Sequence, residues 1–428
     1  MARKAIQICL VLLFFVNIAY SQSLKPIGEK NQNYSSYEIE TEKQTIYQLE
    51  FPQSASSLSM VFPSDSILST YIIANSDTIH LQIDGHLWAE TGRFSSSLIV
   101  FNSETEKIEF YSGDISGPIQ IHLNHTPSIS LVNNYRSMAN VPCGQPSIIP
   151  VSTWRQGLTA PVNLPECSEV KHVIVHHSAT SNALTDYQQI VRDIYVFHTK
   201  PVANGGSGFD DIGYNYLIAP DGSVYQGRDA QGVCDDDNVK GAHMCGRNTN
   251  TMGICLLGTF MDVKPTTAAL SSLYQLIAWK LNKESLSAYG NSWHPVSAPV
   301  VLLENIAGHR EGCNPGYTVC PGDSVYHHLN TIRDSVNLAM SLCIPMAVED
   351  KETASVAVFP QPANDVVFVQ GLAGRALVNL YSSLGEKLKQ IETSEPYITI
   401  PLQEIPKGVY FIEIKSHETY LYKKIVVE

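Results

Sequence analysis

Basic residues are scarce in this chain. Its 428 residues include 28 Lys and Arg against 41 Asp and Glu, which gives a formal net charge of −13. Nucleic acids and anionic membrane surfaces attract positively charged proteins, so this composition argues against both as partners. A neutral or modestly anionic polymer remains compatible with it.

Long apolar runs are missing after the N-terminus. No later segment approaches the roughly 18 apolar residues that a transmembrane helix needs, so stable membrane insertion is not expected. The N-terminus itself has a basic pair, Arg3-Lys4, then an apolar stretch over residues 5–18 and a small residue, Ser21, before Gln22. This pattern predicts a secretory signal peptide over residues 1–21 and therefore an exported protein.

Cysteines are enough for several disulfides. Cys9 leaves with the signal peptide, and Cys255, inside the apolar run 252–257, is predicted to be a buried, unpaired thiol. If Cys320 binds a metal, the others can form up to three disulfides in an oxidising compartment, with the pairing left open by the sequence. These others are Cys143, Cys167, Cys234, Cys245, Cys313 and Cys343.

An acidic loop at residues 232–240 contains three consecutive aspartates, Asp235 to Asp237. Their spacing lacks the alternation and the distal glutamate of a calcium-binding loop, so a solvated loop is expected. Cys234 and Cys245 flank it and are one candidate disulfide pair.

The first region, residues 22–140, has short strand-like runs separated by Ser, Asn, Asp and Gly, which predicts a β-sandwich-like domain. No cluster of catalytic residue types occurs in it. Its role is therefore unknown, and a packing domain is favoured over a carbohydrate-contacting module. The expected strands are residues 46–51, 58–62, 70–73, 78–83, 97–101 and 119–123.

The middle region, residues 141–343, alternates between strand and helix patterns and predicts an α/β domain with a mixed central sheet and flanking helices. A polar linker over residues 344–355 and a strand-rich region over residues 356–428 follow. In the middle region we expect strands at residues 170–175, 214–218, 224–226 and 252–257, and helices at residues 187–199, 266–282 and 324–342.

Two kinds of metal ligand recur at distant points of the middle region. A histidine pair ends the apolar run of Val-Ile-Val-His-His-Ser-Ala-Thr at residues 173–180, and His309 and Cys320 follow much later. Two imidazoles and one thiolate suit zinc, and three protein ligands leave a fourth position open for water. The set is typical of a hydrolase.

The middle region resembles the peptidoglycan recognition proteins and the zinc-dependent N-acetylmuramoyl-L-alanine amidases of the phage-lysozyme type. The resemblance covers about 190 residues and includes several motifs in the family's order. These motifs are residues 173–180, 208–216, 221–228, 241–243, 248, 252–260, 308–310 and 320–323.

The resemblance implies zinc ligands at His176, His309 and Cys320. Alternation of side chains along the strand puts His177 on the other face, where it would line a groove or support the ligands. The metal would activate water for attack on the amide that joins the lactyl group of N-acetylmuramic acid to L-alanine. Tyr214 would orient the water or stabilise the oxyanion. Thr318 is either catalytic or a simple loop hydroxyl. Asp323 is expected to cap a helix that begins at Ser324.

The same resemblance implies contacts with the muramyl peptide. They fall on His198, His243 and Asn248, while Gly208, Phe209 and Arg228 match positions that read diaminopimelate in the third place of the peptide stem. Some family members bind peptidoglycan without cleaving it and lack the cysteine ligand. The presence of Cys320 favours an amidase over such a binding module.

The last region resembles a type IX secretion sorting domain, a small β-sandwich that directs its passenger across the outer membrane. The resemblance rests on residues 356–363, 378–388, 407–411 and 422–427. It implies the type IX machinery as a partner and a location outside the cell or on its surface. An ordinary immunoglobulin-like appendage is the alternative.

Overall fold

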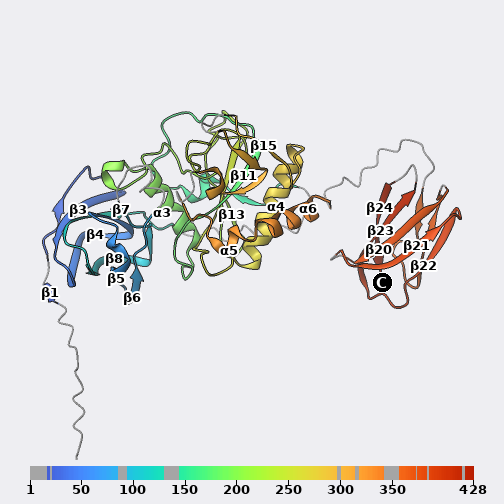
Figure 1. Ribbon diagram of the computed structural model, residues 1–428, viewed down its shortest axis with the longest axis horizontal. Helices are drawn as coiled ribbons and strands as arrows, with labels where there is room; N and C mark the ends of the chain where they lie inside the picture. The colour runs from blue at the N-terminus through green and yellow to red at the C-terminus, as the bar shows by residue number, and fades with distance from the viewer. Residues whose placement is uncertain are drawn as a thin grey trace, which may run out of the picture. The chain divides into compact units, whose positions relative to one another are not determined.

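The computed structural model describes two compact units, Met1–Ile344 and Pro345–Glu428 (Figure 1). Apart from Asn17–Ala19, the predicted signal peptide lies outside the described residues, as do the predicted linker, Cys143 and Cys343. Among the described residues, no helix is long and apolar enough to cross a membrane. The structure describes residues 17–19, 22–84, 94–129, 144–295, 300–313, 318–341, 356–372, 374–382, 385–416 and 420–428.

The first unit begins with a nine-stranded sheet in the order β2-β3-β9-β4-β8-β5-β6, in which β1 and β7 also pair with β4. A short 3-10 helix, η1 (Ser66–Ser69), precedes β5. The strands are β1 (Asn17–Ala19), β2 (Lys25–Pro26), β3 (Tyr34–Thr41), β4 (Thr45–Phe62), β5 (Tyr71–Ala74), β6 (Asp77–His80), β7 (Phe94–Ser95), β8 (Ile99–Tyr111) and β9 (Gly117–Asn124).

Strand β4 differs from its prediction, because the two expected strands at residues 46–51 and 58–62 are one strand of 18 residues. Its pairing with β8 shifts register between Glu50 and Ala55, around Pro52. A proline cannot donate to a ladder, and an irregularity is where a sheet tolerates one. As a result the β-rich region is one continuous sheet around a buried core, not two separate sheets.

The middle of the first unit holds a six-stranded mixed sheet in the order β10-β13-β12-β14-β11-β17, with only the β12–β13 pair antiparallel. The predicted α/β fold class is thereby confirmed. Its strands are β10 (Ile148–Ile149), β11 (His172–His177), β12 (Tyr216–Ile218), β13 (Val224–Gln226), β14 (Thr251–Leu256) and β17 (Ile306–Gly308), next to a hairpin of β15 (Asn291–Trp293) and β16 (Leu302–Glu304).

Helices cover both faces of this sheet. Val173 and Val175 of β11 point into a core with Leu273 of α4, whereas Leu217 and Cys255 share a core with α3. Alternation along the strands thus puts α3 on one face and α4 with α6 on the other (Figure 1). The helices are α2 (Val151–Trp154), α3 (Tyr187–Thr199), η2 (Val202–Asn204), α4 (Thr267–Lys283), η3 (His309–Gly312), α5 (Asp323–Tyr326) and α6 (Leu329–Ser341).

The predicted helix 324–342 is two helices, α5 and α6, separated at His327 and His328. The expectation that Asp323 caps this helix is wrong. Gly322 is the N-cap, and Asp323, the first helical residue, accepts a 2.8 Å hydrogen bond from Arg310 instead.

The second unit is a small β-sandwich with its own core. One sheet has the order β18-β19-β22 and the other β21-β20-β23-β24. The strands are β18 (Ala357–Phe359), β19 (Val366–Gln370), β20 (Ala376–Ser382), β21 (Lys387–Thr393), β22 (Tyr397–Pro401), β23 (Gly408–Ser416) and β24 (Tyr420–Val427).

Candidate metal centre and cavity

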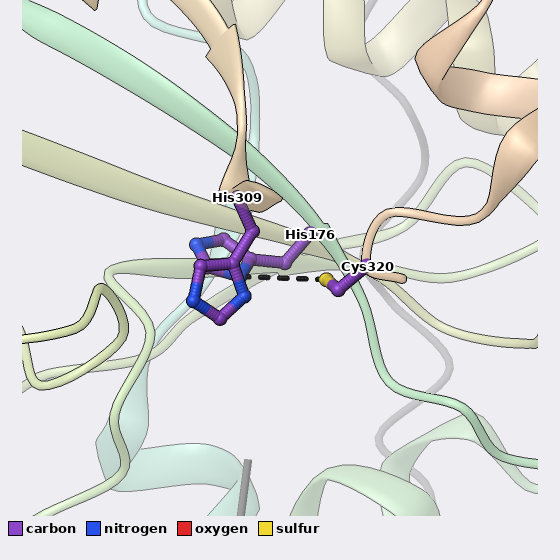
Figure 2. Close-up of side chains that lie close together, drawn as sticks. All are labelled: His176, His309 and Cys320. Atoms are coloured by element: carbon purple, nitrogen blue, oxygen red, sulfur yellow. Dashed lines mark hydrogen bonds between the residues drawn. The ribbon is translucent and has the colours of Figure 1, made fainter. Parts of the chain in front are cut away.

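The histidine-rich strand β11 lies between β14 and β17 in the central sheet, and all six of its residues are buried. Because β17 runs beside β11, His309 emerges next to His176, with ring centroids 4.4 Å apart (Figure 2). Gly308 leaves room for the segment that follows Cys320, since a Cβ there would lie 3.1 Å from Pro321 and 3.0 Å from Tyr326.

Cys320 reaches the same point from the loop that precedes α5. Its Sγ lies 3.7 Å from Nδ1 of His176 and accepts a 3.3 Å hydrogen bond from the backbone N–H of His177 (Figure 2). Arg310 holds the loop by donating to the backbone oxygens of Val319 and Cys320. Thr318 Oγ1 accepts the backbone N–H of Cys320 at 3.1 Å, so Thr318 helps to fix the thiol in place.

The donor set fits zinc. The ligand atoms of His176, His309 and Cys320 lie within 4.8 Å of one another, and all three residues are buried. Tetrahedral zinc with its usual bond lengths places a nitrogen and a sulfur ligand about 3.6 Å apart, close to the 3.7 Å between His176 and Cys320. Burial raises the pKa of the Cys320 thiol to about 12. A bound cation would therefore be needed to hold the thiolate at neutral pH.

His243 orients the first ligand. Its Nδ1 lies 3.0 Å from Nε2 of His176, the nitrogen that faces away from Cys320. Burial lowers the pKa of His243 to about 3, so its ring is neutral and can accept this hydrogen bond. A Cβ at Gly241 or Gly253 would come within 2.4 or 2.6 Å of the His243 ring, so both glycines make room for it.

Asn248 shapes the loop that carries His243. Its Oδ1 accepts the backbone N–H groups of His243 and Met244 at 2.7 and 2.9 Å. Asn248 therefore has a structural task in addition to the predicted contact with substrate.

Two disulfides are described, and they correct the candidate pairing of Cys234 with Cys245. Cys234 pairs with Cys167, and Cys245 pairs with Cys313. The second bridge lies against the metal ligands, since Cys245 Sγ is 3.8 Å from Nε2 of His309. Cys255 is buried and unpaired, as predicted.

The acidic loop is only partly solvated. Asp235 and Asp236 are exposed, but Asp237 is buried and accepts hydrogen bonds from Lys280 at 2.7 Å and Lys283 at 2.8 Å. The expectation of a wholly solvated loop is wrong at Asp237, because the fold brings two α4 lysines to it.

A cavity of about 390 Å³ lies beside the ligand cluster. Among the described residues, Gly208, Arg228 and the three ligands do not contribute to its lining. The predicted site residues that line it are His177, His198, Phe209, Tyr214, His243, Asn248 and Thr318.

Tyr214 stands between the ligands and the predicted substrate contacts. Its ring centroid is 5.2 Å from that of His176 and 5.5 Å from that of His198, which in turn lies 5.6 Å from Phe209. Burial, followed by the nearby Cys255 and Cys320, raises the pKa of Tyr214 well above its usual value. The phenol thus keeps its proton and can donate a hydrogen bond.

Arg228 is half-buried behind Tyr214, whose carbonyl accepts its backbone N–H at 2.9 Å. The side-chain Nε donates to the carbonyl of Ile212 at 3.0 Å. This bond fixes the guanidinium plane and leaves its two terminal nitrogens for other partners.

Sequence reasoning missed one wall of the cavity. Gln82, Ile83, Asp84, Ser97 and Leu98, in the segments that follow β6 and precede β8, line it together with the predicted residues. No local pattern marks these residues, because they reach the cavity only through the way in which the N-terminal sheet packs on α3.

Comparison with known proteins agrees with the geometry. Residues 166–323 match the N-acetylmuramoyl-L-alanine amidase family, and residues 357–428 match the secretion system C-terminal sorting domain. Peptidoglycan recognition protein 3 of Homo sapiens is 35% identical over 190 residues, 44% of this chain and 46% of that protein. Peptidoglycan-recognition protein LE of Drosophila melanogaster is 33% identical over 33% of this chain, which spans only 39% of that relative.

Two solved structures also match this chain, at 27% and 22% sequence identity. Drosophila PGRP-LB is 27% identical with a TM-score of 0.33, covering 43% of this chain and 92% of that chain. The endolysin amidase LysCS of Clostridium intestinale is 22% identical with a TM-score of 0.33, covering 46% of this chain and 98% of that chain. Peptidoglycan recognition protein 1 of Mus musculus is 30% identical over 189 residues, 42% of this chain and 84% of that protein. The chain belongs to the peptidoglycan recognition protein family, and its middle region is an N-acetylmuramoyl-L-alanine amidase domain.

Proposed function

We propose that this protein is a secreted, zinc-dependent N-acetylmuramoyl-L-alanine amidase that hydrolyses the lactyl–L-alanine amide of peptidoglycan. The observation that carries the proposal is the buried cluster of His176, His309 and Cys320 beside a cavity that Tyr214 lines. A binding module needs no such ligand set, since three protein ligands with an open fourth position are the arrangement of catalytic zinc.

Each residue of the centre has a task in this reaction. His176, His309 and Cys320 would hold zinc, which supplies Lewis-acid polarisation of the carbonyl and acidifies water. His243 fixes the ring of His176, and Thr318 fixes the backbone at Cys320. Tyr214, still protonated at neutral pH, donates its O–H to the oxygen on which negative charge develops.

The stem is proposed to be of the diaminopimelate type. Arg228 has its Nε anchored on Ile212, so its terminal nitrogens are presented in a fixed plane. A planar guanidinium binds a carboxylate through two parallel hydrogen bonds, and diaminopimelate has one carboxylate more than lysine. Gly208 and Phe209 are proposed to contact the same part of the stem, and Phe209 lines the cavity next to His198.

The proposed route to the substrate combines two signals. The predicted signal peptide would deliver the chain to the periplasm, and the sorting domain would then engage the type IX machinery. The amidase would act at the cell surface or outside the cell.

Digestion of muropeptides by the purified mature protein tests the activity. Mass spectrometry should detect free stem peptides and stem-free glycan with the wild type, and neither with Cys320→Ser. As a matched control, Cys255→Ser removes the other unpaired thiol and should retain bound zinc. If the wild type binds muropeptides and releases no stem with zinc present, the protein is a non-catalytic recognition module and the proposal fails.

A further inference from the structure

The N-terminal sheet is fixed rigidly to the amidase fold. Asp193 of α3 is fully buried and accepts hydrogen bonds from Ser56, Ser57 and Thr126 at 2.6, 2.8 and 2.8 Å. Leu98, at the start of the segment that leads into β8, belongs to the same hydrophobic core as α3. The side chains of the N-terminal region that lie near the cavity therefore have a fixed position relative to the amidase fold.

The cavity beside the ligand cluster continues along this sheet. A second cavity of about 450 Å³ lies between residues 74–82 and 97–102 of the N-terminal region and residues 179–184 of the amidase fold. The two cavities share Gln82, Ser97, Leu98, Ala179 and Thr259, so they are neighbouring parts of one cleft.

The cleft runs along helix α3, from the C-terminal end of the helix towards its N-terminal end. The surface proposed for the peptide stem lies at the C-terminal end of this helix, where Phe209 donates its backbone N–H to the carbonyl of His198. The second cavity includes Ala183 and Leu184, just before the N-terminal end. The 13 residues of α3 separate these ends by about 20 Å. A substrate with its scissile amide at the metal and its stem towards Phe209 has its sugar on the side of the second cavity.

The chemistry of the second cavity suits a neutral sugar polymer. Amide and hydroxyl side chains dominate its polar lining, among them Asn75, Thr78, Gln82, Asn102 and Ser181. Among the described residues no lysine or arginine lines it, and His80 is its one imidazole. The carboxylate of this lining, Asp77, accepts a 3.1 Å hydrogen bond from Asn102 and would repel a carboxylate-rich stem. Sugar hydroxyls and N-acetyl groups pair with such neutral donors and acceptors.

We propose that the N-terminal sheet supplies a glycan-binding subsite, in which Gln82 and its neighbours bind the amino-sugar strand next to the muramyl residue that is cleaved. This inference rests on the proposed amidase function for the identity of the substrate. In this proposal the N-terminal domain is part of the substrate groove and not only a packing domain.

Two substrates of different length distinguish a defect in this subsite from a defect in the catalytic centre. Thr78 is exposed on β6 and lines the second cavity but not the cavity beside the ligand cluster, so Thr78→Trp should obstruct the proposed subsite and leave the catalytic centre open. On long peptidoglycan strands the variant should lose at least tenfold in kcat/KM, whereas on a single muramyl tripeptide it should stay within about twofold of the wild type. Gln48→Trp, an exposed change on β4 outside both cavities, is the matched control. Equal losses on the two substrates, or no loss on strands, would overturn the proposal.

A binding measurement tests the subsite independently of the proposed hydrolysis. Calorimetry with a stem-free tetrasaccharide of the glycan should show binding to the full mature chain and to Cys320→Ser, and none to Thr78→Trp. A wild type that binds this glycan and releases no stem peptides would refute the amidase function alone. A wild type that cleaves muramyl peptides and does not bind the glycan would refute the subsite alone.

Discussion

At the scale of single residues, the ligand cluster depends on a neutral histidine behind it. His243 shares a 3.0 Å hydrogen bond with the ring of His176 and is enclosed by Gly241 and Gly253. We predict that His243→Ala lowers zinc affinity roughly 10- to 100-fold, the usual effect of losing such a supporting partner. Competition with a metal chelator measures this. His198→Ala, which alters the cavity and not the ligand support, should keep the wild-type affinity, and an equal loss in both variants would contradict the assignment.

Arg228 is the residue on which stem specificity should depend. Replacing it by alanine removes a charged hydrogen-bonding pair worth about 1.5–3 kcal/mol. The preference for diaminopimelate over lysine stems should therefore fall roughly tenfold to a hundredfold, since about 1.4 kcal/mol is a factor of ten. Rates on the two stem types, with zinc content as the control, measure it. The same ratio in wild type and Arg228→Ala would make Arg228 a structural arginine only.

At the scale of elements, the sequence predicts what local patterns determine. Helix α3 runs over the expected residues because Asp186 caps it, accepting the backbone N–H of Gln189 at 2.9 Å, and an apolar stripe follows. The meeting of His176, His309 and Cys320 is equally predictable, since each lies in a short motif at the end of a strand or before a helix. The cavity wall that contains Gln82 is not predictable from local patterns, because it depends on side chains of two distant regions that meet only after folding.

The contact between the N-terminal sheet and α3 contains a buried lysine that should make stability depend on pH. Burial lowers the pKa of Lys200 from 10.5 to about 7, while its Nζ donates to Asn124 at 2.9 Å. Above pH 7 the folded protein has lost this proton and the unfolded chain keeps it, so the free energy of unfolding should rise with pH up to about 8.5. Each unit of pKa shift corresponds to about 1.4 kcal/mol.

Urea unfolding at pH 7.5 and 8.5 tests this dependence. The range stops below pH 9 because burial raises the pKa of the Cys255 and Cys320 thiols, which makes the folded state bind protons more tightly than the unfolded chain at higher pH. The rise should disappear in Lys200→Met and persist in Lys107→Met, an exposed change on β8. An unchanged rise in Lys200→Met would show that another group causes it.

At the scale of the whole molecule, the two β-rich regions resemble each other in sequence pattern and differ in their packing. Residues Leu98 and Val100 of the first region share a core with α3 of the amidase fold. The last region forms a separate compact unit whose core consists of its own strands. Removal of this last region should therefore leave the amidase fold intact.

The separate C-terminal unit allows a test of export. A chain truncated after Asp350 loses residues 357–428, the part that matches the sorting domain. We predict that it crosses the inner membrane through its signal peptide and accumulates in the periplasm as a folded protein with zinc bound, because the ligands lie in the other unit. Fractionation followed by immunodetection measures its location, and zinc content shows that it is folded. The full chain with Cys320→Ser is the control, since it lacks a metal ligand but retains the sorting domain and should reach the outside. Normal levels of the truncated protein outside the cell would contradict the role of the C-terminal unit, because export would then need only the signal peptide.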